Sequence, residues 1–513
     1  MPRRAALSLA LALAATSSAL AAPPAPFPGR PAPEHRLVGG AAAATPVGLT
    51  ARVRAHATFF GASSFPTDRD GTSFDLDPVI DTQFRVRADY RLALSPSARA
   101  AFLTLAYEHD LMSGRVAGGA GDYVGIDAPW SSDADDHQLR QAFARLSFSE
   151  ALTLQLGATT SHWGLGLLAN DGAHGWAPGS GRFSDPRGGD RVLRALVATG
   201  PHTELGLTAF AAIDDVLGDD VLVGDDEAWQ AVAGVMLGLP TDAAQLGLYG
   251  VYRAQEARDG DRTEVGVVDL YGRVTHDAGR VTYGAELEAA LITGSTDLAP
   301  TADHPTHDVL QVGAALRLTA DMCMGGAALD VLFASGDAAF DDDTQSGFRA
   351  DRNFDRGILL DDVVLAARSA RTPIRAADPE LVGVPSEDLD RLPTRGNPTN
   401  TLSFHPRGWL RPVDGLELYA GVLVALSASD ESDAFNARVD SGGYPTNALG
   451  GDPGVLVATE IDLGARVSTL LWGTRLVIGL EGGVLLPGSG LTGPGDLGAD
   501  PVWGGRALVT YEL

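Results

Sequence analysis

The 513-residue chain contains a single cysteine, Cys323, and no lysine, so all 38 of its basic residues are arginine. One cysteine excludes an intramolecular disulfide and any zinc or redox site built on paired thiols. Beyond its first 21 residues the chain has no run of about 18 apolar residues, and no transmembrane helix is predicted. Its net charge is −28, and this acidity argues against nucleic acid as a partner.

The N-terminus has the features of an export signal. Arg3 and Arg4 precede a short apolar run, and the sequence Ala19-Leu20-Ala21 fits the small-x-small pattern of a cleavage site. We expect residues 1–21 to be a signal peptide and residues 22–46, which are rich in proline and alanine, to be a flexible periplasmic leader. The remaining residues, 47–513, are expected to form one domain.

Short segments of alternating polarity run through this domain. In TQFRVRADYRLAL, residues 82–94, the side chains of Arg85, Arg87, Asp89 and Arg91 fall on one face, and the apolar side chains fall on the other. The same alternation recurs up to the C-terminus. The segments are about 10–13 residues long, which is the length of a tilted strand that crosses a bilayer.

The connections between these segments differ in length in a regular way. Short turns join the segments in pairs, and long loops rich in aspartate and glycine separate the pairs; the longest is 336–398. This layout predicts an all-β protein, a transmembrane antiparallel β-barrel of about 18 strands (range 16–18), with long extracellular loops and short periplasmic turns. A soluble periplasmic propeller or solenoid is the alternative, but the chain shows no fixed repeat of about 40–50 residues.

Arginines on the polar faces are the strongest functional feature. An arginine on the lipid face would cost about 2–4 kcal/mol at mid-membrane, so we expect these side chains to face a water-filled interior. Guanidinium groups attract anions and bind carboxylate or phosphate bidentately. Acidic residues share the same faces, so the arginines could also serve to hold the shape of the barrel. The arginines expected along a solute path are Arg52, Arg54, Arg85, Arg87, Arg91, Arg317, Arg407, Arg411, Arg466 and Arg475.

The segment 158–192 lies between two expected strands and is dense in glycine and turn residues. Its apolar centre, residues 163–168, is unusual for a loop in water. We therefore expect the segment to fold back against the wall or into the mouth of the barrel. Its characteristic residues are His162, Trp163, Gly164, Gly166, Asn170, Asp190 and Arg191.

Two sequence blocks resemble known proteins. SHWGLGLLANDG followed by GGDRV resembles the signature of an uncharacterised family of large predicted outer-membrane proteins of Gram-negative bacteria, and LFASGDAAFDDD followed by FRADRNFDRGILLDDVV is similar to a second block of that family. The SGD block and the strand plan distantly resemble alginate-export-type outer-membrane porins. That second resemblance implies an 18-stranded barrel whose arginine-rich interior conducts an anionic polysaccharide.

Two further kinds of site were weighed. Ser161, His162 and Asp171 could be the nucleophile, base and acid of a membrane-bound hydrolase, whose activity would be lost in Ser161→Ala. Neighbouring residues on a strand point to opposite faces, however, so we expect no enzyme. Acidic loop clusters such as 341–343 could bind Ca²⁺ or Mg²⁺, but none has the spacing of a helix-loop-helix calcium site, and we expect no cofactor.

The sequence thus favours a porin-like channel for small hydrophilic or anionic solutes in the outer membrane of a Gram-negative bacterium. Its expected partners are outer-membrane lipid and lipopolysaccharide, the barrel-insertion machinery, and those solutes. A barrel plugged by its own loops, with a structural or adhesive role and no transport, is the alternative.

Overall fold

The described part of the chain, in this computed structural model, consists of residues 47–66, 73–74, 78–94, 101–117, 131–133, 136–148, 151–172, 189–202, 205–222, 226–238, 243–300, 303–339, 342–354, 356–366, 394, 396–430, 446–447, 449–493 and 497–512. The expected signal peptide and leader, residues 1–46, lie outside the described residues.

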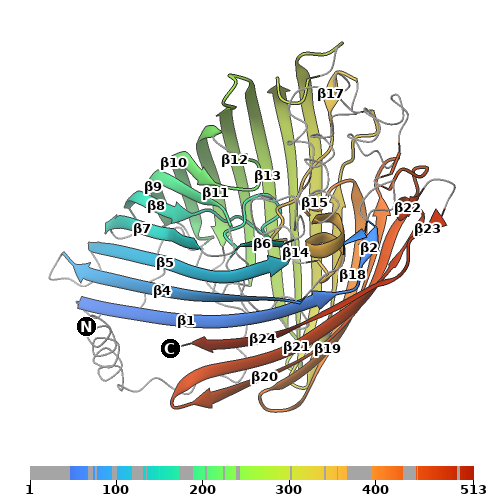
Figure 1. Cartoon of the computed structure of the whole chain (residues 1–513). Coiled ribbons are helices and arrows are strands. Elements are labelled where there is room, and N and C mark those ends of the chain that lie inside the picture. Colours follow the sequence, from blue (N-terminus) through green and yellow to red (C-terminus); the bar gives the residue numbers. More distant parts are fainter. Residues whose placement is uncertain are drawn as a thin grey trace, which may run out of the picture.

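Eighteen long strands form one closed antiparallel barrel (Figure 1). The ring closes because β1 pairs with β4 on one side and with β24 on the other. In chain order the strands are β1 (Val47–Ala62), β4 (Val79–Ala93), β5 (Phe102–Ala117), β7 (Asp136–Phe148), β8 (Leu152–Thr160), β9 (Arg191–His202), β10 (Leu207–Gly218), β11 (Glu227–Gly238), β12 (Ala244–Glu256), β13 (Arg262–Asp277), β14 (Val281–Thr296), β15 (His307–Met322), β16 (Gly325–Ala334), β18 (Thr401–Val413), β19 (Leu416–Ser427), β20 (Leu456–Leu471), β21 (Thr474–Pro487) and β24 (Val502–Glu512).

Shorter elements lie in the connections. They are β2 (Phe65–Pro66), β3 (Ser73–Phe74), β6 (Ser131–Asp133), β17 (Thr344–Gln345), the π-helix η1 (Leu360–Leu365), the 3-10 helix η4 (Ser489–Leu491), β22 (Thr492–Gly493) and β23 (Leu497–Gly498). No helix among the described residues is long and apolar enough to cross a membrane.

The predicted barrel of about 18 strands is confirmed. The period-two alternation indicates strand starts near residues 48, 81, 99, 138, 152, 190, 203, 228, 244, 264, 279, 307, 322, 399, 415, 456, 473 and 502. Each long strand begins within about four residues of the corresponding position. The first residue of β1 and the last of β24 lie toward the same end of the barrel, because Arg54 pairs with Glu512 in the register of these two strands (Figure 1). Which end faces the periplasm stays a prediction.

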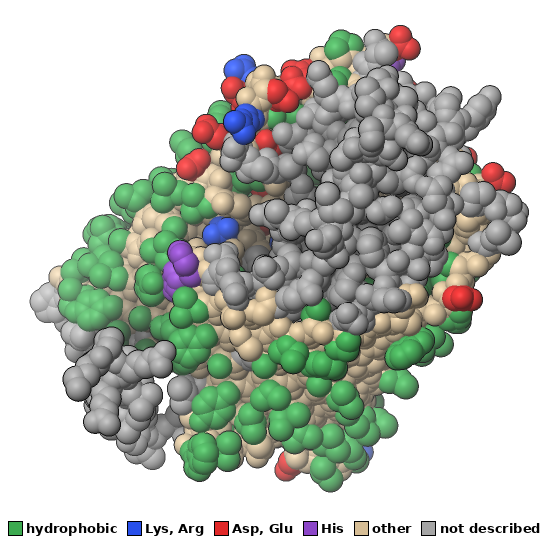
Figure 2. Space-filling view, in the orientation of Figure 1, with side chains coloured by type: hydrophobic (Ala, Val, Ile, Leu, Met, Phe, Trp, Pro, Cys, Tyr) green, Lys and Arg blue, Asp and Glu red, His purple; other side chains and the backbone are tan. Residues whose placement is uncertain are grey.

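The two faces of the wall differ in polarity. On β21, Ile478 and Leu480 are 50% and 64% exposed, whereas the alternating Val477 and Glu481 are buried. Figure 2 shows hydrophobic side chains spread over the outside of the wall. An outer face of large exposed aliphatic side chains is the surface that a barrel presents to lipid chains.

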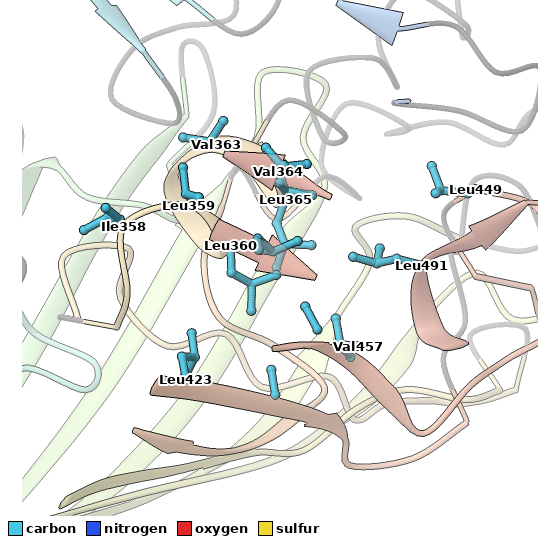
Figure 3. Close-up of a cluster of buried hydrophobic side chains, with 14 of the residues drawn as sticks. Ile358, Leu359, Leu360, Val363, Val364, Leu365, Leu423, Leu449, Val457 and Leu491 are labelled. Atoms are coloured by element: carbon cyan, nitrogen blue, oxygen red, sulfur yellow. The ribbon is translucent and has the colours of Figure 1, made fainter. Parts of the chain in front are cut away.

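Two connections fold against the inner wall. The first inner loop, residues 161–172, follows β8, and the second inner loop, described at residues 346–354 and 356–366, follows β17. Their apolar side chains pack on inner-face side chains of the strands and form the main buried clusters. In Figure 3 the residues around η1 face Leu423 of β19 and Val457 of β20. The core of this protein therefore lies inside the barrel, between the loops and the wall.

Candidate constriction and solute path

The first inner loop is fastened to the wall by Trp163. Trp163 is 4% exposed, and its ring stacks on Tyr249 with 5.0 Å between centroids and lies 6.3 Å from the ring of Phe210. Its Nε1 donates a hydrogen bond of 3.0 Å to Asp269 on β13. Gly247 on β12 makes this fit possible, because a Cβ there would lie 2.7 Å from the indole. The expectation that this segment folds against the wall agrees with this packing.

A buried carboxylate on β14 holds the backbone of the same loop. Glu288 is 0% exposed and accepts hydrogen bonds from the backbone N–H groups of Leu165 and Leu167, the second at 3.2 Å. Gly164 has φ +58°, and a Cβ there would lie 2.4 Å from the Glu288 carboxylate. Glycine is therefore required where the loop passes over the carboxylate.

The other residues of the segment close the loop on itself. Asn170 donates from Nδ2 to the carbonyl of Gly166 (3.2 Å), and its backbone N–H donates to Asp190 Oδ2 (3.1 Å). Arg191 is the first residue of β9. The structure thus brings the characteristic residues of this segment together as one folded unit, and any part they take in solute passage stays a prediction.

The hydrolase alternative can be compared with this geometry. His162 Nδ1 lies 3.4 Å from Asp171 Oδ1, so these two side chains do pair. The hydroxyl of Ser161, however, accepts a hydrogen bond of 3.3 Å from Arg194, whose guanidinium also holds Asp214 at 2.7 Å. The Ser161 hydroxyl therefore helps to hold the loop, and its hydrogen-bond partner in the described part of the chain is a guanidinium and not the base that activates a nucleophile.

The second inner loop rests on a different carboxylate. Glu460 of β20 is 0% exposed and accepts three backbone hydrogen bonds, from Ile358 (2.6 Å), Leu359 (2.8 Å) and Leu360 (2.8 Å). Neither Glu288 nor Glu460 is predicted from the sequence to contact a loop. Strand alternation shows that both glutamates lie on polar strand faces. It does not show that a loop will lie against those faces, so the loop N–H groups that bind them could not be predicted.

The two inner loops also contact each other. The backbone N–H of Asp351 donates to the carbonyl of Leu167 at 2.8 Å. Asp220, in the connection after β10, binds Arg352 Nε at 3.0 Å and Asn397 Nδ2 at 3.0 Å. The first loop, the second loop and the β10–β11 connection therefore meet in one polar junction.

Carboxyl groups gather at this junction. Burial raises the pKa of Asp190 and of Asp351 well above the usual range, and nearby carboxylates, Asp220 among them, raise both pKa values further. Burial also acts to raise the pKa of Asp219, but Arg253, 2.5 Å from its carboxylate, holds that pKa below its usual value. The junction therefore contains two carboxyl groups that resist ionisation beside one that is held ionised.

Most of the predicted solute-path arginines are bound to carboxylates. Arg85 is 8% exposed and grips both oxygens of Asp110, at 2.6 and 2.7 Å. Arg87 binds Asp89, two residues along the same strand face, at 2.9 Å. Other pairs are Arg54 with Glu512, Arg317 and Arg407 with Asp330, and Arg411 and Arg466 with Glu417.

The remaining arginines have other surroundings. Arg52 is exposed and lies opposite Arg87 in the register of β1 and β4, and Arg475 binds the hydroxyl of Ser468 at 3.2 Å. Arg91 stacks over the ring of Phe102, 4.1 Å from its centroid. Cross-strand pairing therefore divides the predicted solute-path arginines into neutralised pairs and a few arginines with other partners.

Arg145 on β7 was not singled out from the sequence. Its Nε and Nη2 both donate to Gln155 Oε1, at 2.9 and 2.6 Å, and its guanidinium lies 5.1 Å from the ring of Phe143. The alternation itself was visible, because Arg145 lies between apolar neighbours as Arg91 does, but a single arginine on a strand is less conspicuous than several on one face.

The described part of the chain contains no cluster of side chains suited to a metal ion. No group of three or more histidine, cysteine, aspartate or glutamate side chains there is placed to hold a metal ion. In the acidic stretch 341–343, Asp341 lies outside the described residues. Asp342 accepts a hydrogen bond from the backbone N–H of Thr344, and Asp343 accepts one from the Thr344 hydroxyl.

Comparison with known proteins identifies the fold. No family model matches the chain, and no curated protein matches it in sequence. Among solved structures it is similar to OccK9 (OpdG) of Pseudomonas aeruginosa, with 12% identity, a TM-score of 0.51, and coverage of 91% of this chain and 98% of that one. OccK1 (OpdK) of the same organism gives 14% identity and a TM-score of 0.50, with 90% and 98% covered.

OccK2 (OpdF) from Pseudomonas aeruginosa, solved in complex with glucuronate, gives 12% identity and a TM-score of 0.49, with 91% and 96% covered. OpdK is described as an outer membrane protein, and these neighbours are porin channels, not enzymes. At this level of identity the likeness establishes the architecture: the chain has the closed 18-stranded barrel fold of the OccK outer-membrane porins.

Proposed function

We propose that this protein is a porin-like channel for small hydrophilic or anionic solutes, with arginine and acidic side chains along its solute path. The observation that carries the proposal is the combination of a closed 18-stranded wall with two loops fastened to its inside by Glu288 and Glu460. Loops held inside a wide barrel narrow it, and a narrowed passage lined by charged groups can select small solutes by size and charge.

The outer membrane of a Gram-negative bacterium is the location that we propose. The apolar outer face of the barrel supports it, and so do the export signal expected in residues 1–21 and the fold shared with outer-membrane porins. In that membrane the partners would be lipid, lipopolysaccharide and the barrel-insertion machinery. We propose no enzymatic step and no cofactor.

A plugged barrel with a structural or adhesive role is the second candidate. It is favoured by the packing of the inner loops, which bury Leu167, Phe348, Leu359 and Leu360 against the wall at no more than 1% exposure. A loop that buries so many apolar side chains is a stable part of the fold, and such a loop can close a barrel as well as narrow it.

Single-channel recording separates the two candidates. The full mature chain, refolded into a planar bilayer, is expected to give discrete conductance steps and a reversal potential that favours small anions. The preference should be larger at low salt, since the Debye length falls from about 30 Å at 0.01 M to about 3 Å at 1 M. A correctly folded barrel that inserts without conducting would refute the channel and support the plugged barrel.

A further inference from the structure

Each inner loop lies on a pair of buried carboxyl groups. Beside Glu288 of β14 lies Asp269 of β13, which is 1% exposed, and beside Glu460 lies Asp462, two residues along β20 and 3% exposed. In each pair the two carboxyl groups are within hydrogen-bonding reach of each other. The first pair is built across two strands and the second along one strand, so the same arrangement arises in two different ways.

The first pair is held by three donors of the first inner loop. Glu288 accepts the backbone N–H groups of Leu165 and Leu167. Asp269 Oδ1 accepts the indole N–H of Trp163. Within the described residues, Asp269 Oδ2 is buried and has no N–H or O–H donor. The two carboxyl groups thus have four oxygens and three loop donors, and a proton on one of the carboxyl groups can supply the fourth hydrogen bond.

The second pair also has three loop donors. They are the backbone N–H groups of residues 358–360, which are labelled in Figure 3, and all three bind Glu460. Both oxygens of Asp462 are buried without a donor among the described residues. Gly483 lies directly opposite Asp462 on β21, and a Cβ there would be 2.4 Å from Asp462 Oδ1, so this carboxyl group packs against the glycine. A proton between Asp462 and Glu460 supplies the hydrogen bond that no other described group provides.

The cations near the first pair are bound to other groups. The titratable and charged side chains on the strands around it are Arg194, Tyr249, Tyr271, Arg273, Glu286 and Arg317. Arg194 binds Asp214 at 2.7 Å, and Arg317 binds Asp330 at 2.5 Å. Tyr271 donates to Glu286 at 2.9 Å. Among the described residues, no cation forms an ion pair with Asp269 or Glu288.

The second pair has a similar environment. The titratable and charged side chains around it are Arg356, Asp362, His405, Arg407, Glu481 and Arg506. Arg356 binds Asp361, and Arg407 binds Asp330. Glu481 accepts hydrogen bonds from Tyr419 and Arg506. No described cation pairs with Glu460 or Asp462, so neither carboxyl pair has a neighbouring positive charge of its own.

Two ionised carboxylates in contact and away from water repel each other strongly, and one shared proton removes this repulsion. The pair then carries a single negative charge, which the three loop donors stabilise. Resting on the proposed channel function, we propose that Asp269 and Asp462 are positioning residues, each of which shares one proton with its neighbouring glutamate and thereby holds an inner loop against the wall. Loss of this proton places two charges under the loop, and the loop leaves the wall and widens the passage.

Proton linkage gives the sign and size of the effect. In a released loop the carboxyl groups are in water and are ionised above about pH 5, whereas the closed loop retains one proton. The closed state therefore binds one proton more than the released state. The equilibrium constant for release should rise about tenfold per pH unit above about pH 5, until the closed pair also ionises. Each loop is thus held most firmly in acid and is released as the pH rises.

Hydrogen exchange of the full mature chain in detergent measures this release one loop at a time. The readout is the protection of the N–H groups of Leu165, Leu167 and residues 358–360, corrected for the intrinsic pH dependence of amide exchange. Between pH 6 and pH 9 this protection should fall by at least about tenfold per pH unit, while the strand amides of β21 stay protected. Loop protection that does not vary with pH in the wild type would overturn the proposal without any variant.

Asp462→Asn distinguishes a shared proton from a merely structural contact. The amide can donate to Glu460 as the shared proton does, but it does not ionise. The pH dependence of protection at residues 358–360 should become shallower by about tenfold per pH unit, and that of the first loop should not change. Asp269→Asn should do the reverse, since its side-chain oxygen can still accept from Trp163. Lower protection at every pH with an unchanged slope would show a structural role only and would overturn the shared proton.

Asp215→Asn is the matched control. Asp215 is exposed on β10, so this variant removes one wall carboxyl group that lies outside both pairs. Its loops should show the wild-type pH dependence of protection. A slope that is equally shallow in Asp215→Asn would assign the effect to the overall charge of the barrel and would overturn the proposal.

Single-channel recording separates this inference from the channel itself. Wild-type conductance should rise between pH 6 and pH 9, and the double variant Asp269→Asn/Asp462→Asn should show a smaller rise. A barrel whose loops exchange as expected but which never conducts would refute the proposed channel and support the shared protons. Conductance in a barrel whose loop protection is independent of pH would refute the shared protons and leave the channel standing.

Discussion

The two inner loops are both held against the inner wall of the barrel, but different side chains hold them. Each loop lies on a fully buried glutamate of the wall that accepts hydrogen bonds from loop backbone N–H groups. Glu288 accepts two from the first loop, and Glu460 accepts three from the second. The first loop adds one large aromatic anchor, Trp163. The second adds many aliphatic side chains around η1 and an internal ion pair of 2.5 Å between Arg356 and Asp361.

This difference separates concentrated from distributed anchoring. A single anchor places most of the docking free energy in one side chain, so one substitution can release the loop. Distributed packing divides the same free energy among many side chains, none of which is decisive. The carboxylate is the feature that both loops share, and it should be critical in both.

The largest effect is expected for Glu460→Ala. The substitution leaves three buried N–H groups of the second loop without an acceptor, at about 1–3 kcal/mol each. The loop should leave the wall, and single-channel conductance should rise with larger fluctuations. Glu264→Ala, on the exposed face of β13, is the control and should conduct as the wild type does. Unchanged conductance in Glu460→Ala would show that the aliphatic packing alone holds the loop.

Trp163→Ala should release the first loop almost as completely. Removing a buried indole costs about 3–5 kcal/mol, and the hydrogen bond to Asp269 is lost with it. Limited proteolysis within residues 161–172 should become rapid while the barrel itself stays resistant. Trp472→Ala is the control, because that indole is 88% exposed in the turn between β20 and β21.

A single aliphatic truncation in the second loop should have a smaller effect. Leu360→Ala removes one of many packed side chains, at about 2–5 kcal/mol, while the Glu460 contacts remain. We expect proteolysis near residue 360 to accelerate less than proteolysis of the first loop does in Trp163→Ala. Equal acceleration would contradict distributed anchoring.

The smallest effect concerns the junction that joins the two loops. Because burial and the charge of Asp220 raise the pKa of Asp351 in the folded protein, this group stabilises the junction fully only below its unfolded pKa of about 3.9. The stabilisation is lost as the pH rises through the raised pKa. Conductance should therefore be lower at about pH 4 than at about pH 8.

Asp351→Asn should reduce this pH dependence, because the amide does not ionise. Asp190 also has a raised pKa at the junction, so part of the pH dependence should remain. Arg352 and the Asn353 N–H act to lower the pKa of Asp351, and neither is changed by the substitution. An identical pH profile in wild type and variant would place the titrating group elsewhere.

Sequence patterns predict some of these structural features and not others. Strand alternation is a local property of the sequence, so it located all 18 strands. The first loop was predicted to fold onto the wall because the apolar side chains at its centre, near residues 163–166, are unfavourable in water. Ion pairing depends on cross-strand register, which alternation does not fix. The sequence therefore did not show that Asp110 neutralises Arg85, or that Glu460 binds loop backbone.

The seam between β1 and β24 can form only at the end of synthesis of the described barrel. It joins residues that are 458 positions apart, Arg54 and Glu512, so the first strand keeps an unpaired edge until the last strand has been synthesised. Bringing such distant ends together is entropically unfavourable and slow, and an open edge invites pairing with other chains. Assembly of this barrel should therefore require a chaperone that protects its first strand, and a chain that lacks β24 should aggregate before it forms a closed ring.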